Sequence, residues 1–347
     1  GKFAFYDTIN FKMTEGIEAR DEEEYLRQYI KELEPITDII ILAVHQGMPG
    51  RQSTIGLTDV ERNLYKDILL AQNVPGVDII VTGHAHQGTE KALVSNGTII
   101  VSTNATATEL GKLQVIFDTE KKKIVSHSNE LITIYDDELE DDADMLREIT
   151  FWQKEVDQVA KVPIVSSTKK LVRAYGKESN MGNLFADAIE AFDPRIDIAV
   201  VNSGALRQDI KPGTVTKGDL ISAFPFPNTV VMTKLKGSQV LKIFNHAAGM
   251  TNGILQVSKN AKYSFSPRNK AHEIWIKGKP LKNDDEYWVA APNFVTQGGD
   301  GYWEFQNSIE YIDTGVLIVD AAEYFLQDME VYEPKYEGRV LVIDSEI

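Results

Sequence analysis

The sequence contains no cysteine, which excludes disulfide bonds and metal sites built from thiolates. It has no apolar run long enough to cross a bilayer, and its first residues, GKFAFYDTIN, lack the charged and apolar regions of a signal peptide. Basic residues are scarce: 36 Lys and Arg stand against 52 Asp and Glu, for a formal net charge of −16. Because this charge repels phosphate polymers and anionic lipid, nucleic acid is a poor partner.

The length and one acidic segment indicate the domain organisation. At 347 residues the chain exceeds the usual size of a single core, which favours two domains. The segment DDELEDDAD, residues 136–144, precedes a helical pattern, and acidic residues favour the N-terminal end of a helix. We therefore interpret residues 136–160 as an acidic linker helix rather than a metal site. It separates a first domain at 1–135 from a second at 161–347, which should fold independently.

Two short apolar runs in the first domain predict neighbouring buried strands. Residues 38–45 end in His45, and residues 77–82 are followed closely by His84. The segment between them has a helical pattern, so the order strand, helix, strand predicts a right-handed parallel unit.

The other predicted elements follow from periodicity and capping signals. Residues 18–33 have the apolar spacing of an amphipathic helix. Thr58 and Glu61 match a capping box that begins a helix running to about Asn73. Later turns predict antiparallel hairpins, and the second domain then reads as an α/β segment. The expected turns and elements are turns at 96–97 and 118–121, helices at 181–192 and 216–223, and strands at 196–201 and 229–235.

Three histidines near the two buried strands are candidate metal ligands. In open α/β sheets ligands collect beyond the carboxyl ends of strands, so we expect His45 and His84 to meet there. His86 follows two residues later, and imidazole is a common metal ligand. The alternative is that all three are loop histidines that only form hydrogen bonds.

Three segments of the second domain carry side chains that suit a flat, polar, aromatic ligand. NSGALR (202–207) ends in an arginine that either binds an anion or is an ordinary surface residue. FPFPN (224–228) places two phenylalanine rings beside prolines. Each ring is either presented at the surface or packed in the core. NFVTQGGDGY (293–302) joins the ring of Phe294 to a glycine-rich loop. The glycines either let a ligand approach the backbone closely or only form a structural turn.

Together these groups favour a nucleoside as the ligand. Rings stack on a base, with about 1 to 3 kcal/mol for each stacked pair, while amide and carboxylate groups bond ring edges and hydroxyls. The remaining histidines, His127, His246 and His272, are assigned no function.

The same motifs resemble a known family. VHQG and TGHAHQG resemble the later motifs of calcineurin-like metallophosphoesterases, and ESNMGNLFADAI, NSGALR, FPFPN and NFVTQGGDGY resemble the C-terminal domain of the 5′-nucleotidase family. The resemblance spans almost the entire chain. It implies an α/β fold: the C-terminal half of a metallophosphoesterase layered sandwich, a linker helix and an α/β C-terminal domain. It also implies an extracellular, periplasmic or cell-surface location.

The resemblance implies roles for particular residues. Members use two divalent metal ions, usually zinc or manganese; His45 and His84 match ligands of one ion and His86 a ligand of the other. Arg173 matches an arginine before the ESNMGN motif, although Lys177 competes for that position. The positions that match the nucleotide-binding site are Asn202, Arg207, Phe226, Phe294, Gly298 and Asp300.

The sequence departs from the family at its beginning. Its first 135 residues contain none of the Asp-x-His, Gly-Asp and Gly-Asn-His-Glu segments that supply the bridging aspartate, further ligands and the catalytic histidine in the family. No catalytic residue is therefore assigned, and we expect this chain alone to have negligible phosphatase activity while a parent protein with those segments is active. The first-domain sheet should also leave an apolar face or edge for a second copy or a preceding segment to cover.

The resulting hypothesis is metal-dependent hydrolysis of nucleotide phosphate esters by the parent protein, with a nucleoside 5′-monophosphate giving nucleoside and phosphate. One alternative is a module that binds nucleosides without hydrolysing them. A UDP-sugar hydrolase or a 2′,3′-cyclic-nucleotide phosphodiesterase is another, because a nucleoside clamp leaves the rest of the substrate open. A purely structural interaction protein is the third.

Overall fold

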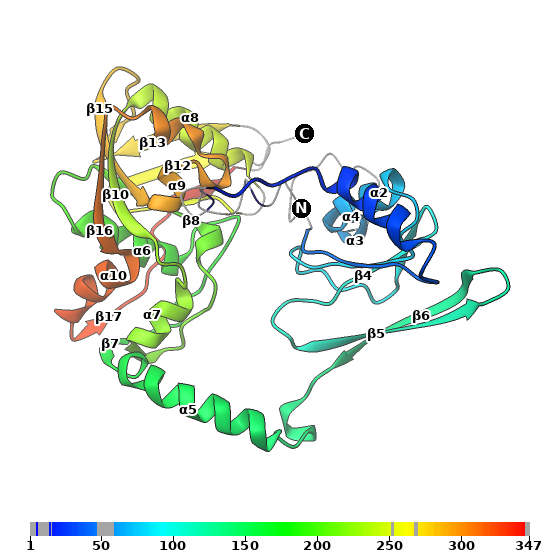
Figure 1. Ribbon diagram of the computed structural model, residues 1–347. Coiled ribbons are helices and arrows are strands. Elements are labelled where there is room, and N and C mark those ends of the chain that lie inside the picture. Colours follow the sequence, from blue (N-terminus) through cyan, green and yellow to red (C-terminus); the bar gives the residue numbers. More distant parts are fainter. Residues whose placement is uncertain are drawn as a thin grey trace. The chain divides into compact units, whose positions relative to one another are not determined.

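A computed structural model describes Phe5, Thr14 and residues 16–46, 59–250, 253–266 and 270–343. The chain divides into two compact units, Gly1–Asp142 and Ala143–Ile347, each with its own apolar core (Figure 1). None of the described helices is long and apolar enough to span a membrane.

The first unit is built on a four-stranded sheet. Its strands are β1 (Ile41–Ala43), β2 (Ile79–Val81), β3 (Leu93–Ser95) and β4 (Thr98–Val101), in the order β1-β2-β4-β3. β1 and β2 pair in parallel, which confirms the predicted parallel unit. The predicted hairpin at 96–97 is present as β3 and β4, and β4 extends the parallel part of the sheet because it also runs parallel to β2.

The helices of the first unit differ from the predicted ones at their ends. α2 (Glu22–Leu33) begins later than residue 18 because Asp21 caps it and accepts a hydrogen bond from the backbone N–H of Glu24. The single helix expected up to Asn73 is two helices, α3 (Asp59–Asn63) and α4 (Tyr65–Asn73), because the backbone of Leu64 leaves the helical region with ψ of 18°. Thr58, the predicted cap, lies outside the described residues.

The two faces of this sheet are covered unequally. On one face, Ile80 and Ile100 pack with Ile30 of α2 and Leu70 of α4. On the other, Ile79, Ile99 and Val101 pack against the long hairpin of β5 (Glu109–Asp118) and β6 (Lys123–Thr133), which turns within the predicted 118–121 region.

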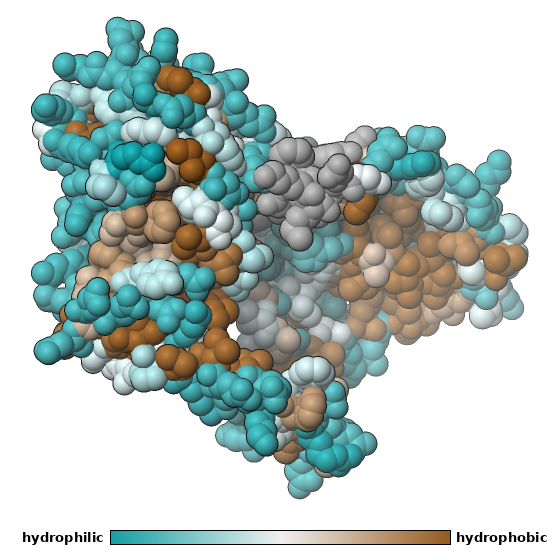
Figure 2. Space-filling model, turned by 60° about the vertical axis from the view of Figure 1, so that its left-hand side comes forward, coloured by the Kyte–Doolittle hydropathy of each residue, from teal (hydrophilic) through white to brown (hydrophobic). Residues whose placement is uncertain are grey.

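That second face is open towards β1. Ile41 is 60% exposed and Val81 is 45% exposed, although both side chains lie on the same apolar face as Ile79. Figure 2 shows apolar surface on the first unit at the right of the view. The sheet therefore has the partly uncovered apolar face that the sequence predicts.

The second unit is a three-layer arrangement around a five-stranded sheet. The sheet order is β11-β8-β15-β10-β16, where the strands are β8 (Ile198–Asn202), β10 (Thr229–Lys236), β11 (Leu255–Val257), β15 (Glu286–Pro292) and β16 (Glu310–Leu317). One face packs against α6 (Asn180–Ala191), α7 (Lys217–Ala223) and α10 (Ile318–Gln327). The other packs against α8 (Gly237–Gly249) and against β12 (Ala261–Phe265) and β13 (Ala271–Ile276).

The remaining elements lie around this core. Helix α5 (Ala143–Ala160) has no buried residue and meets α7. The additional strands are β7 (Pro163–Ser167), β9 (Gly213–Thr216), β14 (Lys279–Pro280), β17 (Val331–Tyr332) and β18 (Val340–Val342). β7 pairs with β9 and β17, while β18 runs parallel to β12 and carries the end of the chain back to the core.

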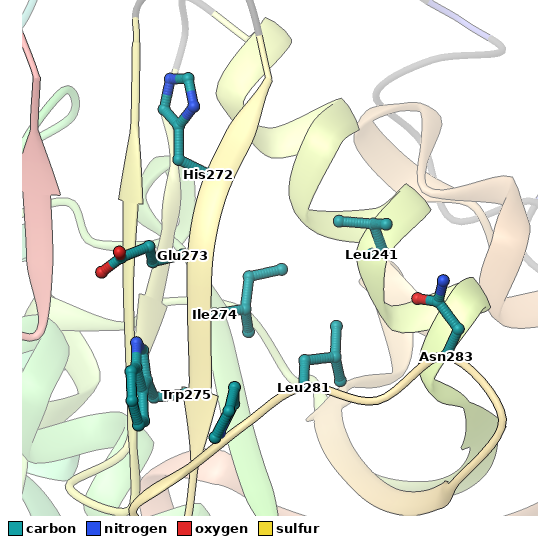
Figure 3. A pocket seen from close by; sticks show the side chains of 8 residues that line it. Leu241, His272, Glu273, Ile274, Trp275, Leu281 and Asn283 are labelled. Carbon is teal, nitrogen blue, oxygen red and sulfur yellow. The ribbon is translucent and has the colours of Figure 1, made fainter.

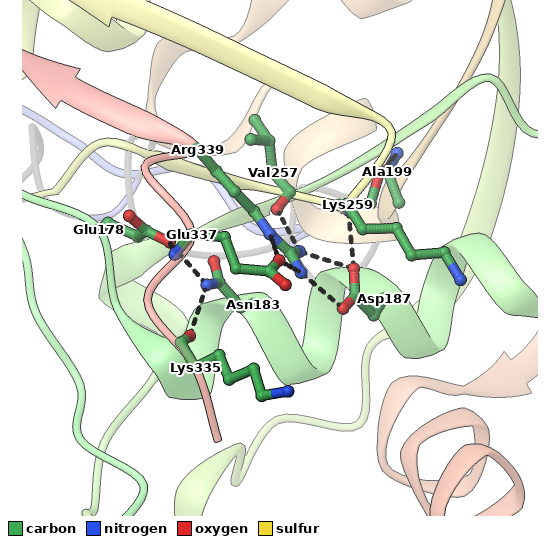
Figure 4. A network of polar contacts seen from close by, with 10 residues as sticks. Glu178, Asn183, Asp187, Ala199, Val257, Lys259, Lys335, Glu337 and Arg339 are labelled. Atoms are coloured by element: carbon green, nitrogen blue, oxygen red, sulfur yellow. Dashed lines mark hydrogen bonds and ion pairs between the residues drawn. The ribbon is translucent and has the colours of Figure 1, made fainter. Parts of the chain in front are cut away.

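A buried polar network holds this last segment against α6 (Figure 4). The guanidinium of Arg339, 6% exposed as a residue, donates to both carboxylate oxygens of Asp187 at 2.6 and 2.8 Å. Glu178 accepts hydrogen bonds from the backbone N–H groups of Glu337 and Gly338 at 2.8 and 2.9 Å. The segment 337–339 is thus fixed by charge-assisted hydrogen bonds in a buried environment.

Removing one partner of this network should destabilise the second unit strongly. Asp187→Ala leaves the Arg339 guanidinium buried beside fewer acceptors, and we expect a loss of about 3 to 5 kcal/mol in the free energy of unfolding. All four tryptophans lie in the second unit, so urea denaturation followed by tryptophan fluorescence measures it.

The exposed ion pair of Lys169 and Glu333, at 3.2 Å, provides the matched control. Glu333→Gln should change the free energy of unfolding by less than about 1 kcal/mol. An equal effect of the two substitutions would show that the buried network does not hold the chain end.

Candidate functional site

The first candidate site lies where the parallel strands β1 and β2 end. Ala43 pairs with Val81, so the segments that follow these residues leave the sheet at the same edge. The hydroxyl of Thr82 donates to the backbone oxygen of Gln46 at 3.0 Å and ties the two segments together. This brings His45 and His84 side by side, as the sequence predicts.

The two imidazoles contact each other through their ring nitrogens. Nδ1 of His84 lies 3.2 Å from Nε2 of His45, and the rings meet edge to face. Two nitrogens that bind one tetrahedral ion at about 2.0 to 2.1 Å are separated by roughly 3.3 Å. Gly83 leaves room for this pair, since a Cβ there would lie 3.1 Å from Nδ1 of His45. The observed 3.2 Å is close to this separation, and it is also the length of a hydrogen bond between the two rings.

The rest of a metal site is not found in the described part of the chain. His86 follows in the same turn with a left-handed φ of 53°, and its side chain is exposed. Among the described residues, no group of three or more His, Asp or Glu side chains is placed to hold a metal ion. The structure thus brings together two of the three predicted ligands.

Asp67 is a residue of this region that the sequence reasoning missed. It lies on α4, is completely buried, and neither of its carboxylate oxygens has a hydrogen-bond partner in the structure as described. Burial raises the pKa of Asp67 to about 6, an effect that the nearby Thr82 and Gln46 oppose. A signal existed, because Asp67 lies three residues after Leu64 on the buried side of the helix.

The second candidate site forms at one edge of the central sheet of the second unit. β8 runs parallel to β15, and β15 runs antiparallel to β10, with Pro292 beside Val230. The end of β8, the end of β15 and the beginning of β10 therefore lie at the same edge. Asn202 ends β8, Phe294 follows β15 by two residues and Phe226 precedes β10 by three, so three distant motifs converge.

A hydrogen bond joins two of these motifs. Nδ2 of Asn202 donates to Oδ2 of Asp300 at 2.9 Å. Asn202 is only 6% exposed, and its side-chain oxygen has no hydrogen-bond partner within the described residues. A buried acceptor of this kind fits an N–H or O–H group of a ligand, because leaving it unpaired costs free energy.

The two rings of the FPFPN segment lie in different places, one in the core and one at the surface. Phe224 is buried and packs against Phe185 in the core. Phe226 is 37% exposed, and the guanidinium of Arg207 lies over its ring, 5.3 Å from the centroid. Arg207 is therefore held beside a presented aromatic ring by a cation–π contact.

The ESNMGN segment shapes the approach to Arg173. Asn180 accepts a hydrogen bond from the backbone N–H of Val172, and Ser179 caps α6. The guanidinium of Arg173 donates to the backbone oxygen of Arg207, which places it against the NSGALR turn. Lys177, the competing position, is exposed and its backbone oxygen accepts a hydrogen bond from Gln256.

The glycine-rich loop is closely packed on the side away from solvent. Gly298, Asp300 and Gly301 all have left-handed φ angles, of 94°, 53° and 80°. A Cβ on Gly299 would lie 2.5 Å from the ring of Phe294, so glycine is required there. His246, to which the sequence assigned no function, lies beneath this loop with its Nε2 2.8 Å from the backbone oxygen of Asp300.

Two hollows of the second unit lie apart from these residues. One, of about 310 Å³, lies between α8 and β13 and has an apolar floor of Leu241, Ile274 and Leu281 (Figure 3). The other, of about 510 Å³, lies beside Trp275 and Arg339. Neither is lined by a predicted site residue, so the candidate site is the sheet edge and not these hollows.

Comparisons with known proteins all find similarity to 5′-nucleotidases or nucleotide phosphoesterases in the part of the chain that they cover. Residues 158–307 match the family described as 5′-nucleotidase, C-terminal domain. The chain is 28% identical over 315 residues to the trifunctional nucleotide phosphoesterase protein YfkN of Bacillus subtilis. This alignment covers 82% of this chain and 21% of the Bacillus protein. The chain is 27% identical over 326 residues to human 5′-nucleotidase, covering 79% of this chain and 56% of the human protein.

The fold also matches a solved structure. The 5′-nucleotidase precursor of Thermus thermophilus superposes with a TM-score of 0.79 at 22% sequence identity, over 94% of this chain and 68% of that chain. The chain thus spans about half of the human relative and a smaller part of the Bacillus one.

The buried carboxyl of Asp67 predicts a pH-dependent stability of the first unit. Its pKa in the folded state, about 6, lies above the ordinary value of 3.8, so folding binds the proton more tightly. The contribution to stability is complete below about pH 4 and is lost as the pH rises to about 6, where the ionised group costs about 3 kcal/mol.

Asp67→Asn removes this titration. Amide hydrogen exchange of α4 and β2 at about pH 4 and about pH 8 should show that the variant loses less protection than the wild type over this interval. Identical pH dependence in the two proteins would contradict the assignment.

Proposed function

We propose that the chain is part of a metal-dependent enzyme that hydrolyses nucleotide phosphate esters, because residues 158–307 match the 5′-nucleotidase C-terminal domain family and about four fifths of the chain is similar to a nucleotide phosphoesterase and to a 5′-nucleotidase. The reaction proposed for the parent protein converts a nucleoside 5′-monophosphate into nucleoside and phosphate. The observation that carries the proposal is the meeting of Asn202, Asp300, Arg207 and Phe226 around one sheet edge.

In this proposal the second unit binds the nucleoside. The base stacks on Phe226 and Phe294, because Phe226 is partly exposed and Phe294 follows β15 at the same edge. The orphaned oxygen of Asn202 accepts a hydrogen bond from the ligand, and the carboxylate of Asp300 accepts from ribose hydroxyls. Gly298 gives the loop its left-handed backbone.

The cations of the site suit the phosphate. Arg207 lies over Phe226, and Arg173 donates to the backbone oxygen of Arg207, so two guanidinium groups are carried by adjoining segments. Guanidinium groups recognise phosphate by paired, charge-assisted hydrogen bonds. The 5′-phosphate on the ribose of a nucleotide whose base stacks on Phe226 would therefore meet positive charge.

The first unit is proposed to contribute metal ligands. His45 and His84 would bind one divalent ion, zinc or manganese, and His86 would bind a second. When bound, such ions polarise a phosphoryl group and supply an activated water. Because the first 135 residues contain no Asp-x-His or Gly-Asn-His-Glu segment to supply the bridging aspartate and the catalytic histidine, we expect the chain by itself to have negligible phosphatase activity.

Two alternatives keep the same binding site. A module that binds nucleosides without hydrolysis is favoured by the two-histidine geometry of the first unit. A UDP-sugar hydrolase or a 2′,3′-cyclic-nucleotide phosphodiesterase would use the same nucleoside clamp with a different phosphate substituent.

Relatedness to 5′-nucleotidases also supports an extracellular, periplasmic or surface location of the parent protein. A second copy or a preceding segment is proposed to cover the open face at Ile41 and Val81.

Calorimetric titration with adenosine tests the clamp. Phe226→Ala and Phe294→Ala should each weaken binding by roughly 5- to 100-fold, because each removes one stacked ring. Tyr324→Ala, which removes a 61% exposed ring on α10, is the matched control and should leave the affinity unchanged. Equal affinities of all four proteins would exclude a stacking clamp.

Titration with zinc tests the first unit. His45→Ala and His84→Ala should each lower zinc affinity by at least about tenfold, since each removes one of two facing nitrogens. His127→Ala, on the exposed part of β6, should bind zinc like the wild type. In the same samples, phosphate release from AMP should stay at the level of the buffer; rapid release by the chain alone would refute the proposal of an incomplete centre.

A further inference from the structure

We propose that His246 is a positioning residue that holds the carboxylate of Asp300 where it meets the ribose diol of a nucleoside. The inference rests on the proposed function and adds to it a residue that sets how strongly the sugar is recognised. It is carried by three independent contacts around one loop: a hydrogen bond, a close approach at Gly301 and a ring contact.

The hydrogen bond fixes the backbone of Asp300. Nε2 of His246 lies 2.8 Å from the backbone oxygen of Asp300. A carbonyl oxygen only accepts, so Nε2 carries the hydrogen and donates it. The bond joins α8 to Asp300, whose carboxylate accepts a hydrogen bond from the side-chain amide of Asn202. By holding the main chain of Asp300, it also fixes where the carboxylate lies.

The conformation that it fixes is an unfavourable one. Asp300 has a φ of 53°, in the left-handed region that residues other than glycine rarely adopt. Such a residue persists only when its surroundings over-determine it. A Cβ on Gly301 would lie 2.9 Å from Cε1 of His246, so the loop approaches the imidazole as closely as glycine allows.

The imidazole itself is held rigidly. Its ring meets the buried ring of Tyr302 edge to face, with centroids 4.7 Å apart. α8 is fastened to the core by Ile243, Phe244 and Ala247, which are all buried. His246 therefore transmits the position of a packed helix to a loop at the edge of the site.

This arrangement predicts a specific loss when the donor is removed. Without the hydrogen bond, the backbone of Asp300 loses one contact that favours the left-handed conformation, while Asn202 still binds its carboxylate. The carboxylate is then held less firmly in the orientation that meets the sugar. Phe226 lies on another segment, before β10, so stacking of the base on its ring should persist, and Phe294 stays packed against Gly299 of the loop. The affected quantity is thus the preference for a ligand with a ribose diol over the same base without one.

Calorimetry with adenosine and 2′,3′-dideoxyadenosine measures that preference in the full chain. Wild type should bind adenosine more tightly than the dideoxy compound. His246→Phe keeps a ring against Tyr302 but has no donor, and His246→Asn has a donor too short to reach. Each should lower the ratio of the two affinities by about tenfold, while His246→Gln, which reaches with its amide, should retain most of it.

A second contact between α8 and the same region provides the control. Lys242 pairs with Glu304 at 3.2 Å on the surface, and Lys242→Ala should leave both affinities unchanged. Thermal unfolding of each variant identifies any that fail to fold, and His246→Asn then carries the test in place of His246→Phe.

The outcomes separate the two levels of the proposal. A variant that weakens adenosine and dideoxyadenosine equally, or leaves the ratio unchanged, overturns the role of His246 while the nucleoside clamp stands. A wild type that binds neither compound overturns the proposed function, and this inference with it. Loss of the ratio in the donor-free variants and its retention in His246→Gln support the inference.

Discussion

The hydrogen bond from Asn202 to Asp300 joins two segments that are almost a hundred residues apart, and the arrangement of the second site depends on it. It forms because β8 and β15 are parallel neighbours in the central sheet, so the residues that follow them leave at the same edge. Antiparallel β10 begins at that edge and brings Phe226 to it. One sheet topology thus collects an amide, a carboxylate and a ring. Burial of the Asn202 amide makes the pairing costly to break, which favours one conformation of the glycine-rich loop.

In the first unit, parallel strand pairing also brings distant side chains together, but only two of them. Parallel pairing of β1 and β2 places His45 and His84 together, with ring nitrogens 3.2 Å apart, while the sheet stays open on one face beside β1. Asp67 lies buried on α4, next to the segments that carry the two histidines, and its ionisation opposes folding. Two features of this unit, a fully buried carboxyl and a partly uncovered apolar face, are ones that isolated stable domains avoid. Both are consistent with our proposal that the parent protein supplies further structure here.

Local signals in the sequence predicted elements well where short-range physics decides them. The turn at Asn96–Gly97, the helix expected at 216–223 and the helix after the acidic segment all appear in the structure. Errors arose where tertiary packing overrides periodicity. Leu64 fits the helical spacing, yet its buried position coincides with a break between α3 and α4. His246 gave no signal because its partner, the backbone oxygen of Asp300, is a group that every residue has and lies 54 positions away.

By itself the sequence determined which chemical groups are available: no thiolates, an excess of negative charge, three histidines near two buried strands, and rings, amides and carboxylates in short motifs of the second unit. These follow from composition and local spacing, which do not depend on how the chain folds. Only the tertiary structure decided which groups meet. It paired His45 with His84, separated core Phe224 from presented Phe226, and set His246 beneath Asp300. The reason is physical: such contacts join residues far apart in the chain, and strand pairing and close packing, rather than local preference, bring them within hydrogen-bonding distance.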